Sequence, residues 1–86
     1  MGKAEKLRAK LFSNPAPKDF TWDELTTLLT SMYDFRVENG NGSRRKFIQN
    51  GTNIVISLHK PHPGNILKEY VVKIVVNTLK EIEANK

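Results

Sequence analysis

The spacing of the apolar residues changes from a helical period to a strand period near Met32, and this change constrains the fold most strongly. Before it, one apolar stripe recurs at helical spacing: Leu25, Leu28, Leu29 and Met32. After it, Tyr33, Phe35 and Val37 alternate with polar residues, as in a strand with one buried face. A helix that leads directly into strands predicts a domain of the α+β class.

The start of this helix carries its own sequence signal. Thr21 and Glu24 have the spacing of a capping box, in which each side chain accepts a hydrogen bond from the other residue's backbone N–H. Phe20, immediately before the cap, can pack on Leu25 as a hydrophobic staple. An earlier short amphipathic helix is expected over residues 2–12, and the prolines that follow end it.

Two turn signals divide the middle of the chain into three strands. Asn39-Gly40-Asn41-Gly42 and Asn50-Gly51 are typical of hairpin turns. Strands are therefore expected over residues 33–38, 43–49 and 54–58. A last helix is expected between Leu67 and Ala84, where neither Gly nor Pro occurs, with one apolar face: Val71, Ile74, Val75, Thr78, Leu79 and Ile82. The predicted fold is α+β, with order α-α-β-β-β-α and the helices on one face of an antiparallel sheet.

A chain of 86 residues is long enough for one hydrophobic core but not for two, so we expect a single domain over residues 1–86. Residues 1–17 are expected to form a helical extension with a proline-containing linker, and residues 18–86 the core. The absence of cysteine excludes disulfides and thiolate metal sites. No apolar run approaches the roughly 18 residues of a membrane span, and the N-terminus lacks the apolar core of a secretory signal. We expect a soluble, cytoplasmic protein with no membrane contact.

The net charge of +5 is concentrated in one segment. Between Phe35 and Lys68 the only acid is Glu38, and the rest of the chain is neutral overall. The basic residues of the segment are Arg36, Arg44, Arg45, Lys46, Lys60 and Lys68. A local, uncompensated excess of this kind predicts an anionic partner, with nucleic acid as the foremost class.

The alternation of the strands sorts these residues by face. If Phe47 and Ile56 face the helices, one polar set shares the exposed face: Arg44, Lys46, Ser57 and His59. Arg45 has the parity of Phe47 and must reach the sheet edge or solvent. Arg offers a planar fork of donors and Lys a point charge, so residues 44–46 are candidate phosphate ligands. The alternative is a solubilising face that protects the sheet edge.

Two histidines, His59 and His62, flank Lys60-Pro61 after the third strand. An imidazole there can act as a general acid or base, although a polar loop residue is the alternative. Two histidines without cysteine or a nearby carboxylate fall short of a zinc ligand set. We therefore expect no metal and no other cofactor. Residues 39–43 could cradle phosphate with their N–H groups, but the pattern favours an ordinary hairpin turn.

The run Gly42-Ser43-Arg44-Arg45-Lys46-Phe47 is followed by an apolar strand, His62-Pro63, Leu67-Lys68 and the closing helix. In this order the chain, over about residues 22–82, resembles the HicA family of toxins, whose signature is Gly-Ser-His-x-x-Phe and later His-Pro. The resemblance implies a fold like double-stranded-RNA-binding domains and ribosome-independent mRNA cleavage without metal. It also implies a HicB-like antitoxin protein that covers the basic face.

Arg44 stands where the family has its catalytic His. A guanidinium stays protonated, so it cannot be a general base, but it can hold a phosphate and stabilise its developing charge. Either His59 or His62 then transfers the proton, or the chain binds RNA without cutting it. The family's His-Pro pair favours a turn role for His62, which leaves His59 as the catalytic candidate beside Arg44.

The expected RNA-binding residues are Arg44, Arg45, Lys46, Lys60, His62 and Lys68. The leading hypothesis is a HicA-type toxin that binds and cuts mRNA. One alternative is a non-catalytic RNA-binding module or an inactive family member that binds only its antitoxin. Another is a basic adaptor between proteins, which would have no RNA affinity even at low salt.

Overall fold

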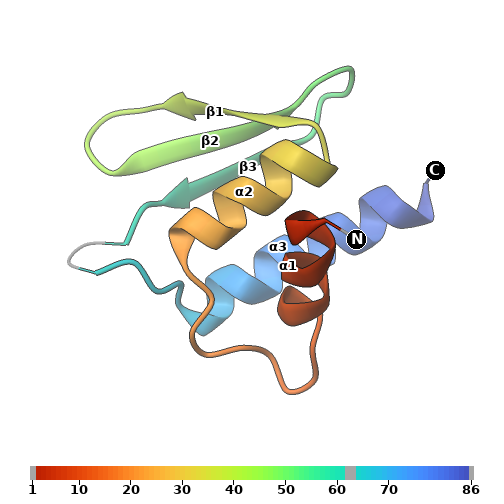
Figure 1. Ribbon diagram of the computed structural model, residues 1–86. Helices are drawn as coiled ribbons and strands as arrows, with labels where there is room; N and C mark the ends of the chain where they lie inside the picture. The colour runs from red at the N-terminus through yellow and green to blue at the C-terminus, as the bar shows by residue number, and fades with distance from the viewer. Residues whose placement is uncertain (1, 62–63, 86) are drawn as a thin grey trace.

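The computed structural model describes residues 2–61 and 64–85 (Figure 1). Its elements, in chain order, are α1 (Lys3–Leu11), α2 (Trp22–Met32), β1 (Phe35–Asn39), β2 (Arg44–Gln49), β3 (Val55–His59) and α3 (Glu69–Ala84). The predicted α-α-β-β-β-α order is confirmed. The three strands form one antiparallel sheet in the order β1-β2-β3, which makes the sheet a simple meander.

The sheet buries only one of its faces. Phe35, Phe47, Ile56 and Leu58 point inward and are almost fully buried, whereas their neighbours along β2 and β3 are exposed or half-buried. Trp22 of α2 packs on Phe47, with ring centroids 5.3 Å apart. The helices therefore cover the inner face, and the outer face is open to solvent, as the strand alternation predicted.

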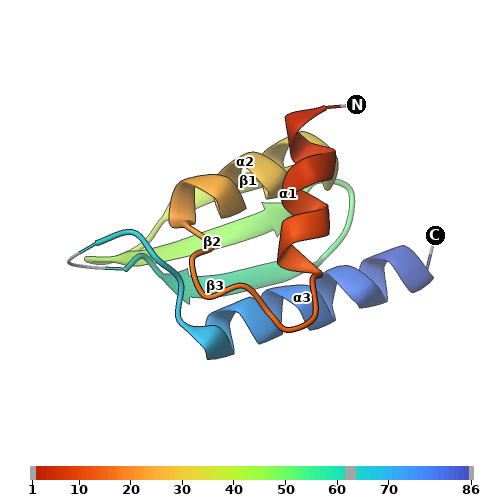
Figure 2. The same ribbon diagram turned by 60° about the horizontal axis from the view of Figure 1, so that its bottom comes forward.

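A single hydrophobic core joins the helices to the sheet. α1 contributes Leu7 and Leu11, and α3 contributes Val72, Val75 and Leu79, all buried in one cluster. Figure 2 shows α1 crossing α2 and α3, so the N-terminal helix closes the outer side of the helical layer. No polar or charged residue among those described is buried, so the core itself is purely apolar.

The start of α2 has the predicted capping box. The Glu24 N–H donates to Thr21 Oγ1 over 3.1 Å, and the Thr21 N–H donates to Glu24 Oε1 over 3.0 Å. Phe20 and Leu25 are both fully buried, as expected for a staple. Partial burial acts to raise the pKa of the Glu24 carboxyl, but hydrogen bonds from the Thr21 backbone and from Lys10 outweigh it and lower the pKa.

The passage from α2 to β1 differs from the prediction. β1 begins at Phe35, and Tyr33 caps the C-terminus of α2 instead of starting the strand. Asp34 has φ 59°, the left-handed conformation that ends many helices and that Asp tolerates. Its carbonyl accepts from the Asn50 N–H over 3.0 Å, which ties the helix end to the β2–β3 turn.

Three residues predicted to be buried lie outside the core, and one of them is Val37, which is 38% exposed on the edge strand β1. Met32 is 38% exposed at the last position of α2, and Ile74 is 46% exposed on α3. Val72 takes the buried position instead, because the face of α3 that meets the core is rotated relative to the predicted one. The apolar run in α3 surrounds the helix, so its sequence does not single out one side.

Candidate nucleic-acid interface

The outer face of the sheet gathers the polar set that the sequence predicted. Arg44 of β2 lies directly opposite His59 of β3, and Lys46 lies directly opposite Ser57. All four side chains are exposed. They line a shallow cavity of about 480 Å³ together with residues of the β1–β2 turn. We call these four residues the outer-face cluster.

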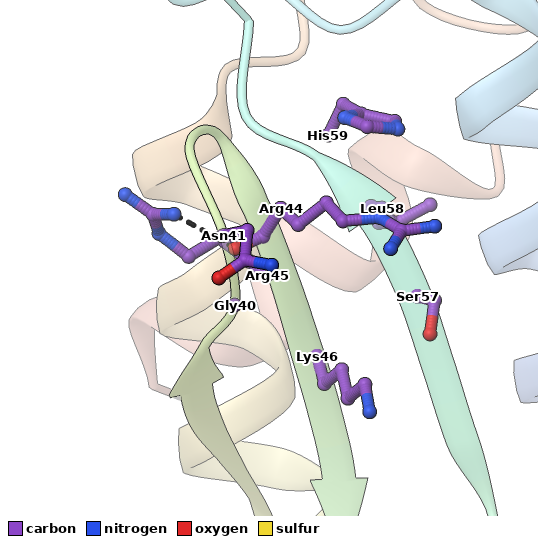
Figure 3. Close-up of a pocket in the computed structure, with 8 residues that line it drawn as sticks. All are labelled: Gly40, Asn41, Arg44, Arg45, Lys46, Ser57, Leu58 and His59. Carbon is purple, nitrogen blue, oxygen red and sulfur yellow. Dashed lines mark hydrogen bonds between the residues drawn. The ribbon is translucent and has the colours of Figure 1, made fainter.

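The two cations of the outer-face cluster point into the same space. Figure 3 shows the Arg44 side chain extended across β3, with Lys46 and Ser57 farther along the same face. Among the described residues, neither cation has an acidic partner. Glu38 pairs in register with Lys46, but its carboxylate accepts from Arg36 Nε over 3.3 Å. The cluster therefore keeps an uncompensated positive charge.

Gly40 belongs to this site, although the sequence pattern indicates only a turn there. A Cβ added there would lie 3.1 Å from the Cβ of Arg44, so the glycine leaves room for that side chain. Its N–H donates to the Arg44 carbonyl over 2.9 Å, and the Arg44 N–H donates to Asn41. The Gly40 N–H, one donor of the candidate phosphate cradle over residues 39–43, is therefore used within the hairpin.

Arg45 is directed away from the outer-face cluster (Figure 3). Its Nη1 donates to the carbonyls of Gly42 and Arg44, over 2.9 and 2.7 Å, and the residue is half-buried. It lines a second, more open cavity with Lys60 and Asp23. Arg45 also contributes to the lining of the outer-face cavity, so its guanidinium is turned toward local carbonyls but the residue still borders that site.

Lys60 and Lys68 lie next to the outer-face cluster, beyond the end of β3. The Lys60 N–H donates to the Ser43 carbonyl over 2.8 Å, which extends the pairing of β2 and β3 past His59. Lys60, Lys68 and His59 line one further cavity of about 320 Å³. His62, the other residue predicted to bind RNA, lies outside the described residues.

The chemistry available on this surface is that of cation–phosphate contacts with one imidazole nearby. Arg44 supplies a fork of donors and Lys46 a point charge, and His59 stands beside Arg44 across the strand pair. Over residues 2–61 and 64–85, no group of three or more His, Cys, Asp or Glu side chains could hold a metal ion. No helix in the described ranges is long and apolar enough to cross a membrane.

No family model matches the chain, and neither the curated proteins nor the solved structures include a significant match.

Proposed function

We propose that this chain is an RNA-binding toxin of the HicA type, which binds the phosphates of mRNA through the outer-face cluster and is neutralised by a HicB-like antitoxin protein. The observation that supports this most is the register of β2 and β3, which brings Arg44, Lys46 and His59 together on an exposed face. The α+β order, and the run 42–47 apart from Arg44 in place of the family's histidine, match the pattern of that family.

Binding follows from the charge of the cluster. Each Lys or Arg that neutralises a phosphate releases condensed counterions, so affinity falls steeply as salt rises. Arg44 and Lys46 have no acidic partner among the described residues, so no internal ion pair has to break before they meet RNA. Such contacts position the RNA and carry no base specificity.

Cleavage is assigned to His59, with Arg44 beside it. The neutral imidazole takes the proton of the ribose 2′-hydroxyl as that oxygen attacks phosphorus. The new O2′–P bond forms as the P–O5′ bond breaks, and solvent protonates the leaving oxygen. Arg44 stabilises the negative charge that develops on the phosphoryl oxygens. The products are a 2′,3′-cyclic phosphate and a 5′-hydroxyl.

Binding is tested by titrating a labelled single-stranded RNA with the protein at several salt concentrations. Lys46→Ala should weaken binding and reduce the slope of log K against log salt by about one. Lys80→Ala, which removes an exposed lysine of α3, is the matched control and should change neither. If both variants lose the same affinity, the outer-face cluster is not the binding surface.

Cleavage is tested by inducing the protein in bacteria and following growth and transcripts. Growth arrest with fragmented mRNA supports the toxin, and His59→Ala should abolish cutting while RNA affinity remains. Retained cutting would remove His59 from the mechanism.

A second candidate, RNA binding without cleavage, is favoured by Arg44 in place of the family's histidine. Salt-sensitive RNA binding with intact transcripts at every pH would select it.

A further inference from the structure

A cavity of about 320 Å³ lies between the end of β3 and the start of α3. Its polar lining comes from Ser43, His59, Lys60, Lys68 and Tyr70, and none of the described residues that line it is acidic. His59 also lines the cavity of the outer-face cluster, so the two cavities adjoin at that side chain. This second cavity is called the Tyr70 cavity below.

Tyr70 stands in the first turn of α3 and is 60% exposed, the most exposed of the large hydrophobic side chains in the described ranges. Its hydroxyl has no hydrogen-bond partner among the described residues. Val71 and Val72 beside it already anchor this turn in the core. Packing of the fold therefore does not account for an aromatic ring at this position.

The cations around the ring indicate what it could bind. Lys60 and Lys68 are exposed and have no acidic partner among the described residues, and both line the cavity that the ring enters. An aromatic ring beside uncompensated cations is the combination that binds unpaired nucleotides, because bases stack on the ring while cations hold the backbone.

We propose that Tyr70 stacks on an unpaired nucleobase of RNA whose neighbouring phosphate is held by the outer-face cluster. This inference rests on the proposed function and narrows its substrate to single-stranded RNA. Bases within a duplex are stacked on each other and do not present a face to the ring. His59, at the junction of the two cavities, then lies between the bound base and the bound phosphate.

The test compares three RNA probes: a uridine octamer, the same octamer with abasic riboses, and an RNA duplex. Tyr70→Ala should weaken binding of the uridine octamer by about tenfold or more, the loss expected from one stacked base. Affinity for the abasic octamer and for the duplex should stay unchanged. Tyr70→Phe, which keeps the ring, should bind the uridine octamer like the parent protein. Thermal melting followed by circular dichroism checks that the Ala variant is folded. We expect it to fold, because the Tyr70 side chain is mostly exposed.

The outcomes separate the two proposals. Equal affinity of Tyr70→Ala and parent protein for the uridine octamer, with Lys46→Ala still weakened, overturns the stacking inference and keeps the RNA-binding function. An equal loss on all three probes also overturns it, because the effect would not depend on a base. If the parent protein binds none of the probes at low salt, both proposals fail. The exposed side chains of Ile66, Tyr70 and Ile74 would then be interpreted as a contact surface for a protein partner.

Discussion

At position 44 the chain carries an arginine where the family it resembles has a histidine. Arg44→His restores an imidazole opposite His59, on the exposed face of the strand pair. Such an imidazole loses its proton near pH 6.5 and becomes available as a base. If the parent protein binds RNA without cutting it because position 44 lacks a base, we expect the variant to gain cleavage, with a rate that rises with pH through this region. Single-turnover cleavage of a defined RNA across pH measures it.

Lys80→His is the control for this substitution, because Lys80 is exposed on α3 and does not line the cavity of the outer-face cluster. It should leave the cleavage rate unchanged. A rate in Arg44→His no higher than in the parent protein, at any pH, would contradict the family-type role of position 44.

Much of the residue placement could be predicted from the sequence. The strand alternation placed Arg44, Lys46, Ser57 and His59 on one face and Arg45 on the other, because the side-chain period of a strand is two. Tyr70 could not be predicted in this way. It begins an apolar run, Tyr70–Val76, in which the buried and exposed members become distinct only when the helix meets its packing partners.

Among the elements, α2 depends on its N-terminal cap. Thr21→Ala removes the side-chain acceptor of the Glu24 N–H, one of the otherwise unpaired donors at the helix start. We expect the free energy of unfolding to fall by about 1 kcal/mol. Chemical denaturation followed by circular dichroism measures this change.

Thr30→Ala makes the same chemical change at an exposed position inside α2. Alanine has the higher helix propensity there, so stability should stay level or rise. If Thr21→Ala and Thr30→Ala lower the free energy of unfolding equally, the capping hydrogen bond of Thr21 does not stabilise the protein.

The three helices are joined by a cluster of polar side chains. Arg8 of α1 donates to Glu83 of α3 through Nε over 2.8 Å, and the Tyr33 hydroxyl at the end of α2 donates to the same carboxylate. Burial, together with the hydrogen bond to Glu83, raises the pKa of Tyr33 to about 12. The pKa of Arg8 is raised as well, mainly by its hydrogen bond to Glu83.

This cluster predicts a pH dependence of stability at alkaline pH. The pKa of tyrosine in an unfolded chain is about 10, so the folded state holds the Tyr33 proton more tightly. Its contribution is fully present below pH 10 and is lost as pH rises from about 10 to about 12. Tyr33→Phe should lack this part of the decline. Urea denaturation of the variant and the parent protein at a series of pH values measures the difference. If the free energies of unfolding of the two proteins fall in parallel from about pH 10 to about pH 12, the prediction for Tyr33 is contradicted.

The elements differ in how far the sequence predicts them. The capping box of α2 is local, since its partners stand three residues apart, and it was predicted correctly. The start of β1 was not, because Tyr33 fits the strand alternation and the left-handed Asp34 has no sequence signal strong enough to exclude it. The buried face of α3 also depends on tertiary packing, which explains why Ile74 was placed wrongly.

In the molecule as a whole, the two layers differ in how their charges are arranged. The helical layer pairs its charges internally, as Arg8 with Glu83, Lys10 with Glu24 and Lys73 with Glu69. The outer face of the sheet leaves Arg44 and Lys46 without acidic partners among the described residues. The outer face therefore presents two cations without an acidic partner in the described ranges, which favours the approach of a polyanion on that side.

The most direct test is an NMR titration of the isotope-labelled protein with single-stranded RNA at low salt. The proposed interface predicts that the largest amide shift changes occur at Arg44, Lys46, Ser57 and His59, with smaller changes at the start of α3. Amides of α1 and the exposed side of α2 should stay constant, and added salt should reverse the shifts. Changes centred on the helices, or none at any RNA concentration, would contradict the proposal that the outer sheet face binds RNA.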